Sequence, residues 1–195
     1  MSDKDIYKAQ PRKTDHFAKV LILTADKTED LEFFYPYYSF LEEGFQVQVV
    51  TPNGGAFEGK KGLGLKETSK IPDVNAKDFD LLFIPGGKAP EALKVNADAI
   101  SLVQDFAKQD KPIAAICHGP QVLAAADVIR NRRIAAWPEC QKEMEAAGAT
   151  FVDQECVQDG LFITARMPAD LPAFTHAVRS MINRKSAHNH ARQAA

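Results

Sequence analysis

Short, almost wholly apolar segments alternate along this chain with longer segments of helical pattern, and this alternation constrains the fold more than any other feature. The apolar segments predict strands at Lys19–Thr24, Phe45–Thr51, Asp80–Pro85 and Pro112–Cys117, with a fifth strand ending before Ala136. The helical segments are Asp30–Glu43, Glu91–Gln109, Pro120–Arg130 and a last helix that begins at Pro168–Pro172 and ends near Ile182. Strands that are apolar on both faces are typical of a parallel sheet covered by helices on both sides. We therefore expect an α/β fold with a mostly parallel sheet.

The first predicted helix has apolar residues at the spacing of a single buried face. These residues are Leu31, Phe34, Tyr35, Tyr38 and Leu41. Pro36 is expected either to bend this helix or to mark its start, because proline cannot donate the backbone hydrogen bond of a helix interior. Turn residues predict two hairpins in addition, one across the Asp-Gly turn within Val157–Phe162 and one between Gly55 and Thr68.

Length and composition indicate a single domain. A chain of 195 residues with 45% hydrophobic content can bury one substantial core. We expect this domain to span residues 17–183. Residues 1–16 are polar and charged, and residues 184–195 are basic, rich in alanine and without apolar periodicity, so both ends are expected to be loose tails.

The charge pattern argues against nucleic-acid binding, because 24 basic and 26 acidic residues are spread along the chain without a basic cluster. No apolar segment approaches the ~20 residues that a membrane-spanning helix needs. Three widely spaced cysteines form neither a disulfide framework nor a zinc pattern, and His188 and His190 lack a third ligand. We expect a cytoplasmic protein without a metal or a cofactor.

A sharp strand-to-helix turn is predicted at Ala115–Gly119, where an apolar strand meets a helical segment. A small residue two positions before Cys117 and a glycine two positions after it are what such a turn requires, because larger side chains would collide there. The sulfur of Cys117 would then project from the fold at the first turn of a helix, where the helix dipole favours the thiolate. Cys117 is therefore the candidate nucleophile, although many free cysteines are simply buried packing residues.

The carboxyl ends of parallel strands meet at one edge of a sheet, and ligands bind there. The residues that follow the predicted strands should therefore surround one cleft. They are Glu29, Asp30, Gly86, Gly87, His118 and Trp137.

Several of these residues have a possible chemical role. Glu29 could keep its proton and hydrogen-bond the sulfur of Cys117, or it could be only a residue favoured by the helix dipole. The backbone N–H groups of Gly87 and His118 could hold an oxyanion. His118 follows the nucleophile directly, so its side chain is expected to point elsewhere unless a carboxylate, possibly from another subunit, orients it.

Four segments of the chain resemble the ThiJ/PfpI family, the superfamily that includes the Parkinson-disease protein deglycase. They are Glu29-Asp30 with Tyr35-Pro36, Ile84–Glu91, Ala115–Gln121, and Thr164–Arg166 with Pro168–Leu171. The likeness covers about Val20 to Ile182, and Met167 departs from it, since the family often has a histidine before the proline. The resemblance implies a flavodoxin-like three-layer sandwich and a homo-oligomer of two or more subunits.

The resemblance also implies roles for individual residues. Cys117 matches the nucleophile, Glu29 the acid that hydrogen-bonds it, and Gly87 part of the oxyanion pocket, next to Gly86. Glu91 matches the acid that reaches His118 across a subunit interface in PfpI-type proteases. Trp137 and Arg166 are expected to line the substrate pocket.

Three functions fit this set of residues. A cofactor-free glyoxalase or deglycase would use Cys117 to attack small reactive aldehydes or their protein adducts. An intracellular cysteine peptidase would use Cys117, His118 and the Glu91 of a neighbour on peptide substrates. A redox sensor or chaperone would act through oxidation of Cys117 alone. Glutamine amidotransferase chemistry is excluded, because it needs a His-x-Glu pair late in the chain. The late histidine His176 is followed by Ala177-Val178 and not by a glutamate. Small-aldehyde chemistry is the favoured reading.

Overall fold

The computed structural model describes the backbone of residues 18–193 and the side chains of residues 18–184. The predicted tail at residues 1–16 lies outside this range. A seven-stranded sheet forms the centre of the molecule, in the order β10-β11-β7-β6-β1-β2-β5. Its strands are β1 (Lys19–Leu23), β2 (Gln46–Thr51), β5 (Ser69–Lys70), β6 (Leu81–Ile84), β7 (Ile113–Ile116), β10 (Val157–Asp159) and β11 (Phe162–Ala165). All neighbours in this sheet pair in parallel except β10 and β11.

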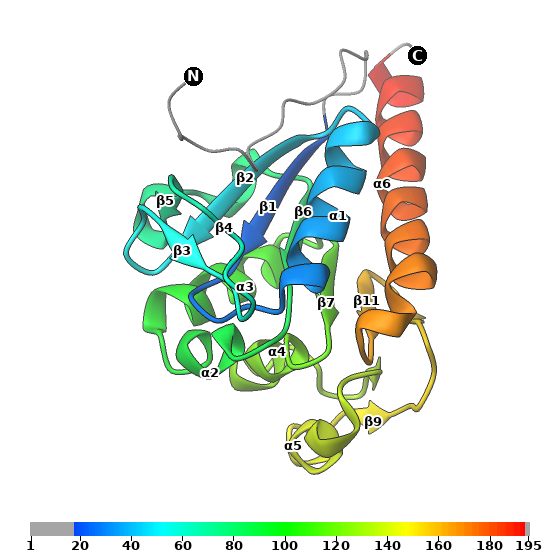
Figure 1. Cartoon of the computed structure of the whole chain (residues 1–195). Coiled ribbons are helices and arrows are strands. Elements are labelled where there is room, and N and C mark those ends of the chain that lie inside the picture. Colours follow the sequence, from blue (N-terminus) through cyan, green and yellow to red (C-terminus); the bar gives the residue numbers. More distant parts are fainter. Residues whose placement is uncertain (1–17, 194–195) are drawn as a thin grey trace.

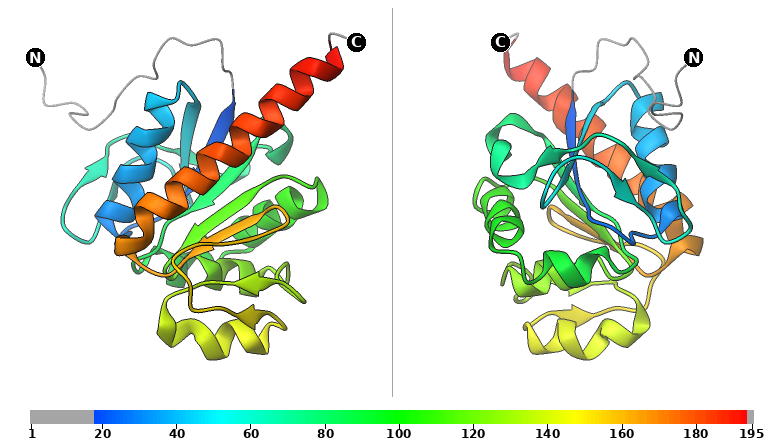
Figure 2. Two further views of the ribbon diagram at one scale, coloured as in Figure 1. Left: turned by 90° about the vertical axis from the view of Figure 1, so that its right-hand side faces the viewer. Right: turned by 60° about the vertical axis from the view of Figure 1, so that its left-hand side comes forward.

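Helices cover both faces of the sheet, as Figures 1 and 2 show. They are α1 (Asp30–Glu42), α2 (Ala89–Leu93), α3 (Ala97–Lys108), α4 (Pro120–Ala125), α5 (Gln141–Ala146) and α6 (Leu171–Gln193). Helices α1 and α6 lie side by side on one face, and α3 and α4 cover the other. This is the flavodoxin-like sandwich that was predicted. No helix in the part of the chain that the structure describes is long and apolar enough to cross a membrane.

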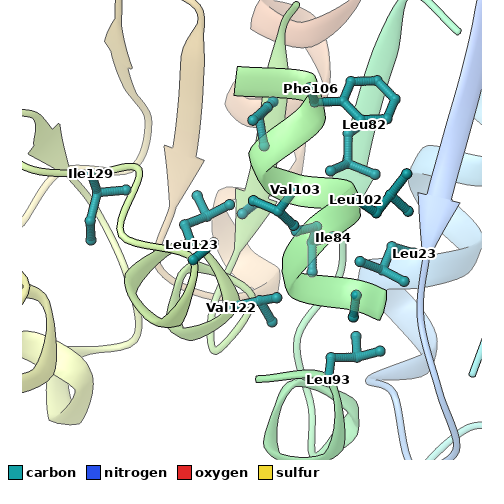
Figure 3. Close-up of a cluster of buried hydrophobic side chains, with 14 of the residues drawn as sticks. Leu23, Leu82, Ile84, Leu93, Leu102, Val103, Phe106, Val122, Leu123 and Ile129 are labelled. Atoms are coloured by element: carbon teal, nitrogen blue, oxygen red, sulfur yellow. The ribbon is translucent and has the colours of Figure 1, made fainter. Parts of the chain in front are cut away.

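The alternation of side chains along each strand divides the core in two. Leu21 and Leu23 of β1 point into one core, whereas Val20 and Ile22 point into the other. The first core lies between the sheet and α2, α3 and α4, and its central residues are shown in Figure 3. Since both faces of the strands are covered, the central strands read as continuous apolar segments, which explains why they were predicted well.

Both predicted hairpins are confirmed. Strands β10 and β11 form an antiparallel pair across Gly160, whose φ is +58°, and β3 (Phe57–Glu58) pairs with β4 (Gly64–Leu65). The predicted fifth strand of the main sheet is wrong, because β8 (Arg133–Ile134) pairs with β9 (Thr150–Phe151) in a separate sheet. The strand beside β7 is β11.

Three helix predictions need correction. Helix Glu91–Gln109 is two helices, because the side chain of Asn96 accepts a hydrogen bond from the N–H of Ala99 at 2.9 Å and starts α3 anew. Helix Pro120–Arg130 is shorter and ends at Ala125. Helix α6 continues to Gln193, where a loose tail was predicted, because residues 184–193 lack the glycine or proline that would end a helix.

The predicted buried stripe of α1 is wrong in part: Phe34 and Leu41 are buried as predicted, but the other three residues of the stripe are exposed. Leu31, Tyr35 and Tyr38 are 60%, 48% and 40% exposed, and the buried apolar residues are Phe33, Phe34, Tyr37, Phe40 and Leu41. Helix α1 is apolar on most of its circumference, so periodicity alone could not choose between two overlapping stripes. Pro36 lies inside the helix, which starts at Asp30.

Candidate active site

Cys117 lies on the predicted sharp turn between β7 and α4. Its φ is +61°, in the left-handed region that residues other than glycine seldom adopt. A Cβ at Gly119 would lie 2.5 Å from the carbonyl oxygen of Ile84, so only glycine fits two positions after the cysteine. The N–H of Cys117 donates to the carbonyl of Ala165 at 3.0 Å, which fixes the turn against β11. Strained backbone of this kind costs about 1–3 kcal/mol and is common at functional sites.

The sulfur of Cys117 is less exposed than the turn predicted. The residue is only 6% exposed. The backbone N–H groups of Gly87 and His118 both hydrogen-bond the sulfur. These are the two amides expected to form an oxyanion pocket, so the structure brings them to the reacting atom.

The carboxyl group beside the sulfur belongs to Glu32, and the predicted hydrogen bond from Glu29 is wrong. Glu32 is fully buried, its Oε2 accepts the N–H of Gly86 at 3.0 Å, and its carboxyl group hydrogen-bonds Cys117. Glu29 lies one helical turn earlier, at the N-cap of α1, and its Oε2 faces the Nζ of Lys60 at 3.4 Å. Glu32 is one of two carboxylates, with Asp30, in the first turn of an otherwise apolar helix start, and this signal could have made it a candidate.

Burial sets the protonation of the Cys117 and Glu32 pair. It raises the pKa of Glu32 from 4.5 to about 7, although the hydrogen bonds from Cys117 and Gly86 lower it. Burial and the adjacent Glu32 carboxylate also raise the pKa of the Cys117 thiol, whereas the Gly87 and His118 amides lower it. The predicted easily ionised thiol is therefore wrong for the resting site. The two groups share one negative charge, and the thiolate is favoured only when Glu32 holds the proton.

His118 contacts the nucleophile directly, contrary to the prediction. Its Nδ1 lies 3.1 Å from the sulfur of Cys117. The left-handed backbone at Cys117 turns the chain so that two consecutive side chains meet. Burial lowers the pKa of His118, against the effect of the carboxylates of Glu139 and Glu91. A neutral imidazole therefore stands beside the thiol near pH 7.

Trp137 lies at the same site, although the strand that was expected to deliver it belongs to another sheet. Its ring stacks on His118 with centroids 5.9 Å apart and planes at 21°. The backbone N–H of Trp137 donates to the carbonyl of Cys117 at 2.9 Å. Glu91 is exposed on α2, and its predicted contact with His118 across a subunit interface stays a prediction.

Arg166 is engaged by acidic neighbours, and its place in the substrate pocket stays a prediction. Its Nε and Nη2 each donate to the carboxylate of Asp170 at 2.9 Å, and its Nη1 donates to Asp153 at 2.7 Å. All three guanidinium nitrogens are occupied. Arg166 follows Ala165, whose carbonyl accepts the N–H of Cys117. The ion pairs of Arg166 therefore stabilise the segment against which the Cys117 turn is bonded.

The β3–β4 hairpin is fastened beside the site by Asp30. The buried carboxylate of Asp30 accepts the N–H of Lys61 at 2.7 Å and the N–H of Leu63 at 3.0 Å. This places Lys60 at the rim, against Glu29. Within residues 18–184, no three His, Cys, Asp or Glu side chains are grouped to hold a metal ion.

The raised pKa of Glu32 predicts a pH-dependent stability. Below about pH 4.5 the carboxyl is protonated in both the folded and the unfolded chain, and above pH 7 the folded chain bears the full cost of ionising it. A shift of this size corresponds to about 3 kcal/mol. The difference in unfolding free energy between Glu32→Gln and the wild type should therefore shift by about 3 kcal/mol in favour of the variant when the pH is raised from 4.5 to 8. Urea unfolding at both pH values measures this, and an equal difference at both would contradict it.

The comparisons with known proteins agree with this geometry. Residues 18–181 match the family model described as "DJ-1/PfpI family". A deglycase from Pyrococcus horikoshii is 42% identical over 156 residues, covering 80% of this chain and 94% of that protein. The protein/nucleic acid deglycase 2 of Escherichia coli is 40% identical over 159 residues, covering 80% of this chain and 92% of that protein.

A solved structure from Anabaena variabilis is also similar. It is a two-domain protein containing DJ-1/ThiJ/PfpI-like and ferritin-like domains, and it superposes with a TM-score of 0.83 at 36% identity. The match covers 85% of this chain and 48% of that one, so this chain spans about half of that protein. The family model covers most of the chain and the sequence relatives match over nearly their whole length, and the chain therefore belongs to the DJ-1/PfpI family.

Proposed function

We propose that this protein is a cofactor-free deglycase or glyoxalase that acts on small reactive aldehydes, such as methylglyoxal, or on their protein adducts. The observation that carries the proposal is the surroundings of Cys117: a carboxyl group, an imidazole and two backbone amides contact one sulfur. The names of the deglycases at 42% and 40% identity support it. The small exposed fraction of Cys117 favours a small electrophile over a folded polypeptide.

The first step joins the sulfur to the aldehyde. His118 accepts the thiol proton at Nδ1, the Cys117 sulfur bonds to the aldehyde carbon, and the carbonyl π electrons move to oxygen. The amides of Gly87 and His118 stabilise that oxyanion, which then takes the proton from the imidazole. The product of this step is a hemithioacetal.

The second step moves a proton between two carbons. The Glu32 carboxylate removes the proton from the carbon bound to sulfur and returns it to the neighbouring carbon, while the hydroxyl proton of the hemithioacetal moves to the oxygen on that neighbouring carbon. This converts the hemithioacetal into a lactate thioester without an oxidant. A carboxyl group with a pKa of about 7 suits both directions of this transfer. Water then cleaves the thioester, releasing lactate and the Cys117 thiol, so methylglyoxal and water give lactate.

Lactate production from methylglyoxal by the purified protein tests the proposal. We expect turnover by the wild type and a loss of at least about 1,000-fold in Cys117→Ala, since the covalent step then has no nucleophile. Lactate formed equally by both proteins, or no lactate from either, would reject the proposal. Cleavage of casein that is lost in Glu91→Ala would instead support the peptidase reading, and oxidation of Cys117 by low peroxide without either activity would support the redox reading.

We further propose that the protein works in the cytoplasm as a homo-oligomer. Cys117, Cys140 and Cys156 are all free thiols, as a reducing compartment requires. The exposed apolar residues Leu31, Tyr35 and Tyr38 on α1 are consistent with a contact between subunits. Light scattering of the purified protein would give the subunit number, and a strict monomer would contradict this part.

A further inference from the structure

Trp137 is the single tryptophan of the chain, and it lies against the histidine of the active site. The indole and imidazole rings have centroids 5.9 Å apart and planes at 21°. Aromatic pairs at this separation contribute about 0.5–1.5 kcal/mol beyond the area that they bury. The contact is therefore strong enough to bias which rotamer His118 adopts.

Trp137 is itself fixed relative to the nucleophile by contacts that do not involve His118. The backbone N–H of Trp137 donates to the carbonyl of Cys117 at 2.9 Å, and the backbone carbonyl of Trp137 accepts the N–H of Cys140 at 2.8 Å. The half-buried indole packs against the cores on both faces of the sheet. These contacts fix the position of the indole ring, which can therefore restrict the position of the His118 imidazole beside it.

His118 has few other contacts that could orient it. Its Nδ1 faces the sulfur of Cys117 at 3.1 Å, and among residues 18–184 its Nε2 has no hydrogen-bond partner. In many active sites a carboxylate or carbonyl holds the second nitrogen of such a histidine. Among the side chains that the structure describes, the other specific contact of the imidazole ring is with the ring of Trp137.

We propose that Trp137 is a positioning residue, which holds the His118 imidazole by stacking so that Nδ1 stays within hydrogen-bond reach of the Cys117 sulfur. Within one subunit, this stacking would do what the sequence analysis assigned to an orienting carboxylate. It deepens the proposed function, because His118 is the base of that reaction, but the contact can be tested without turnover.

The charges around His118 are consistent with a neutral, stacked ring. Glu139 precedes α5, Glu91 lies on α2, Glu143 lies on α5 and Lys60 lies in the β3–β4 hairpin. The three carboxylates raise the pKa of His118, whereas Lys60 and the larger effect of burial lower it. Burial thus keeps the imidazole able to accept the thiol proton near pH 7.

The fluorescence of the single tryptophan tests the contact directly. Protonated imidazole quenches an adjacent indole, so the emission should fall on acidification with a midpoint below pH 6.5. In His118→Gln this transition should disappear. A transition that persists unchanged in His118→Gln would overturn the proposal, because the two rings would then not be in contact.

The alkylation rate of Cys117 by iodoacetamide, followed by mass spectrometry of its peptide, tests the positioning. Trp137→Leu keeps apolar volume but removes the aromatic face, and it should slow alkylation at pH 7 by about tenfold, whereas Trp137→Phe should stay within about threefold. In a His118→Gln background, Trp137→Leu should have no further effect.

An equal slowing by Trp137→Leu with and without His118 would show a merely structural role and overturn the proposal. Wild-type alkylation in Trp137→Leu would overturn it as well. Both results can be read even if methylglyoxal is not a substrate, so failure of this inference and failure of the proposed function are distinguishable. If Trp137→Leu does not fold, the alkylation rate of Trp137→Phe and the fluorescence titration still test whether the indole contacts and positions His118.

Discussion

Glu32→Gln is expected to lower methylglyoxal turnover by about 100-fold or more, which is the usual loss when a positioned acid–base group is removed. The glutamine keeps an oxygen that can accept the N–H of Gly86, but it cannot carry a proton to or from the substrate. The same variant should be more stable than the wild type at pH 8, because it removes a buried ionisable group. Loss of activity together with a gain in stability is the signature of a residue kept for chemistry.

Glu29→Gln is the matched control, since it makes the same change one helical turn away. Glu29 faces the half-exposed Lys60 at 3.4 Å, and surface pairs of this kind are worth about 0–1 kcal/mol. Turnover by Glu29→Gln should therefore fall by less than about fivefold. Steady-state kinetics of both variants at pH 7 measure the contrast. If Glu29→Gln loses more activity than Glu32→Gln, the assignment of the acid to Glu32 is wrong.

The choice between these two carboxylates shows where sequence reasoning stops. The loop after the first strand could be placed at the carboxyl edge of the sheet, because strand order and helix starts follow from local patterns. Glu29 and Glu32 are three residues apart and therefore lie on the same side of the start of α1. Which of them reaches the sulfur depends on how far along its axis α1 begins relative to Cys117. No local pattern gives that distance, and the position of Glu29 in the loop favoured the wrong carboxylate.

Features that depend on backbone sterics were predicted more reliably than features that depend on burial. The turn at Cys117 and the close approach at Gly119 follow from residue size alone, and both are present. The ionisation of the thiol depends on how much solvent reaches it and on the neighbouring carboxylate, neither of which is local in sequence. The helix dipole predicted an easily ionised thiol, but burial beside Glu32 raises the pKa of Cys117.

Arg166 and Trp137 illustrate the same limit for longer-range contacts. The two carboxylates that pair with Arg166 belong to Asp153, before β10, and Asp170, directly before the last helix, so local sequence patterns could not show that this guanidinium is paired. Trp137 was placed at the site for the wrong reason, as the end of a strand in the main sheet. It reaches Cys117 because residues 135–137 follow β8, a strand of the small β8-β9 sheet, and the backbone N–H of Trp137 bonds to the carbonyl of Cys117.

Gly86→Ala is expected to have an equally large effect on turnover, because Gly86 is where the nucleophile, the acid and an amide come together. An added Cβ would lie 2.5 Å from the Oε2 of Glu32, 2.7 Å from the Cβ of Cys117 and 3.0 Å from the N of His118. At least one of these groups must move by several tenths of an ångström. Misplacement of catalytic groups by about 1 Å can cost about 100-fold in rate, so we expect a loss of that order.

Gly55→Ala separates this crowding from the general cost of replacing a glycine. Gly55 has a φ of +73°, and nothing lies within 4 Å of its added Cβ, so the substitution should strain the backbone and leave the site intact. Both variants should lose about 1–3 kcal/mol of unfolding free energy, but only Gly86→Ala should lose turnover. Urea unfolding and lactate production measured on the two proteins test this. Full activity in Gly86→Ala would mean that Glu32 can move away from the sulfur without consequence, and the acid–base role argued here for Glu32 would then fail.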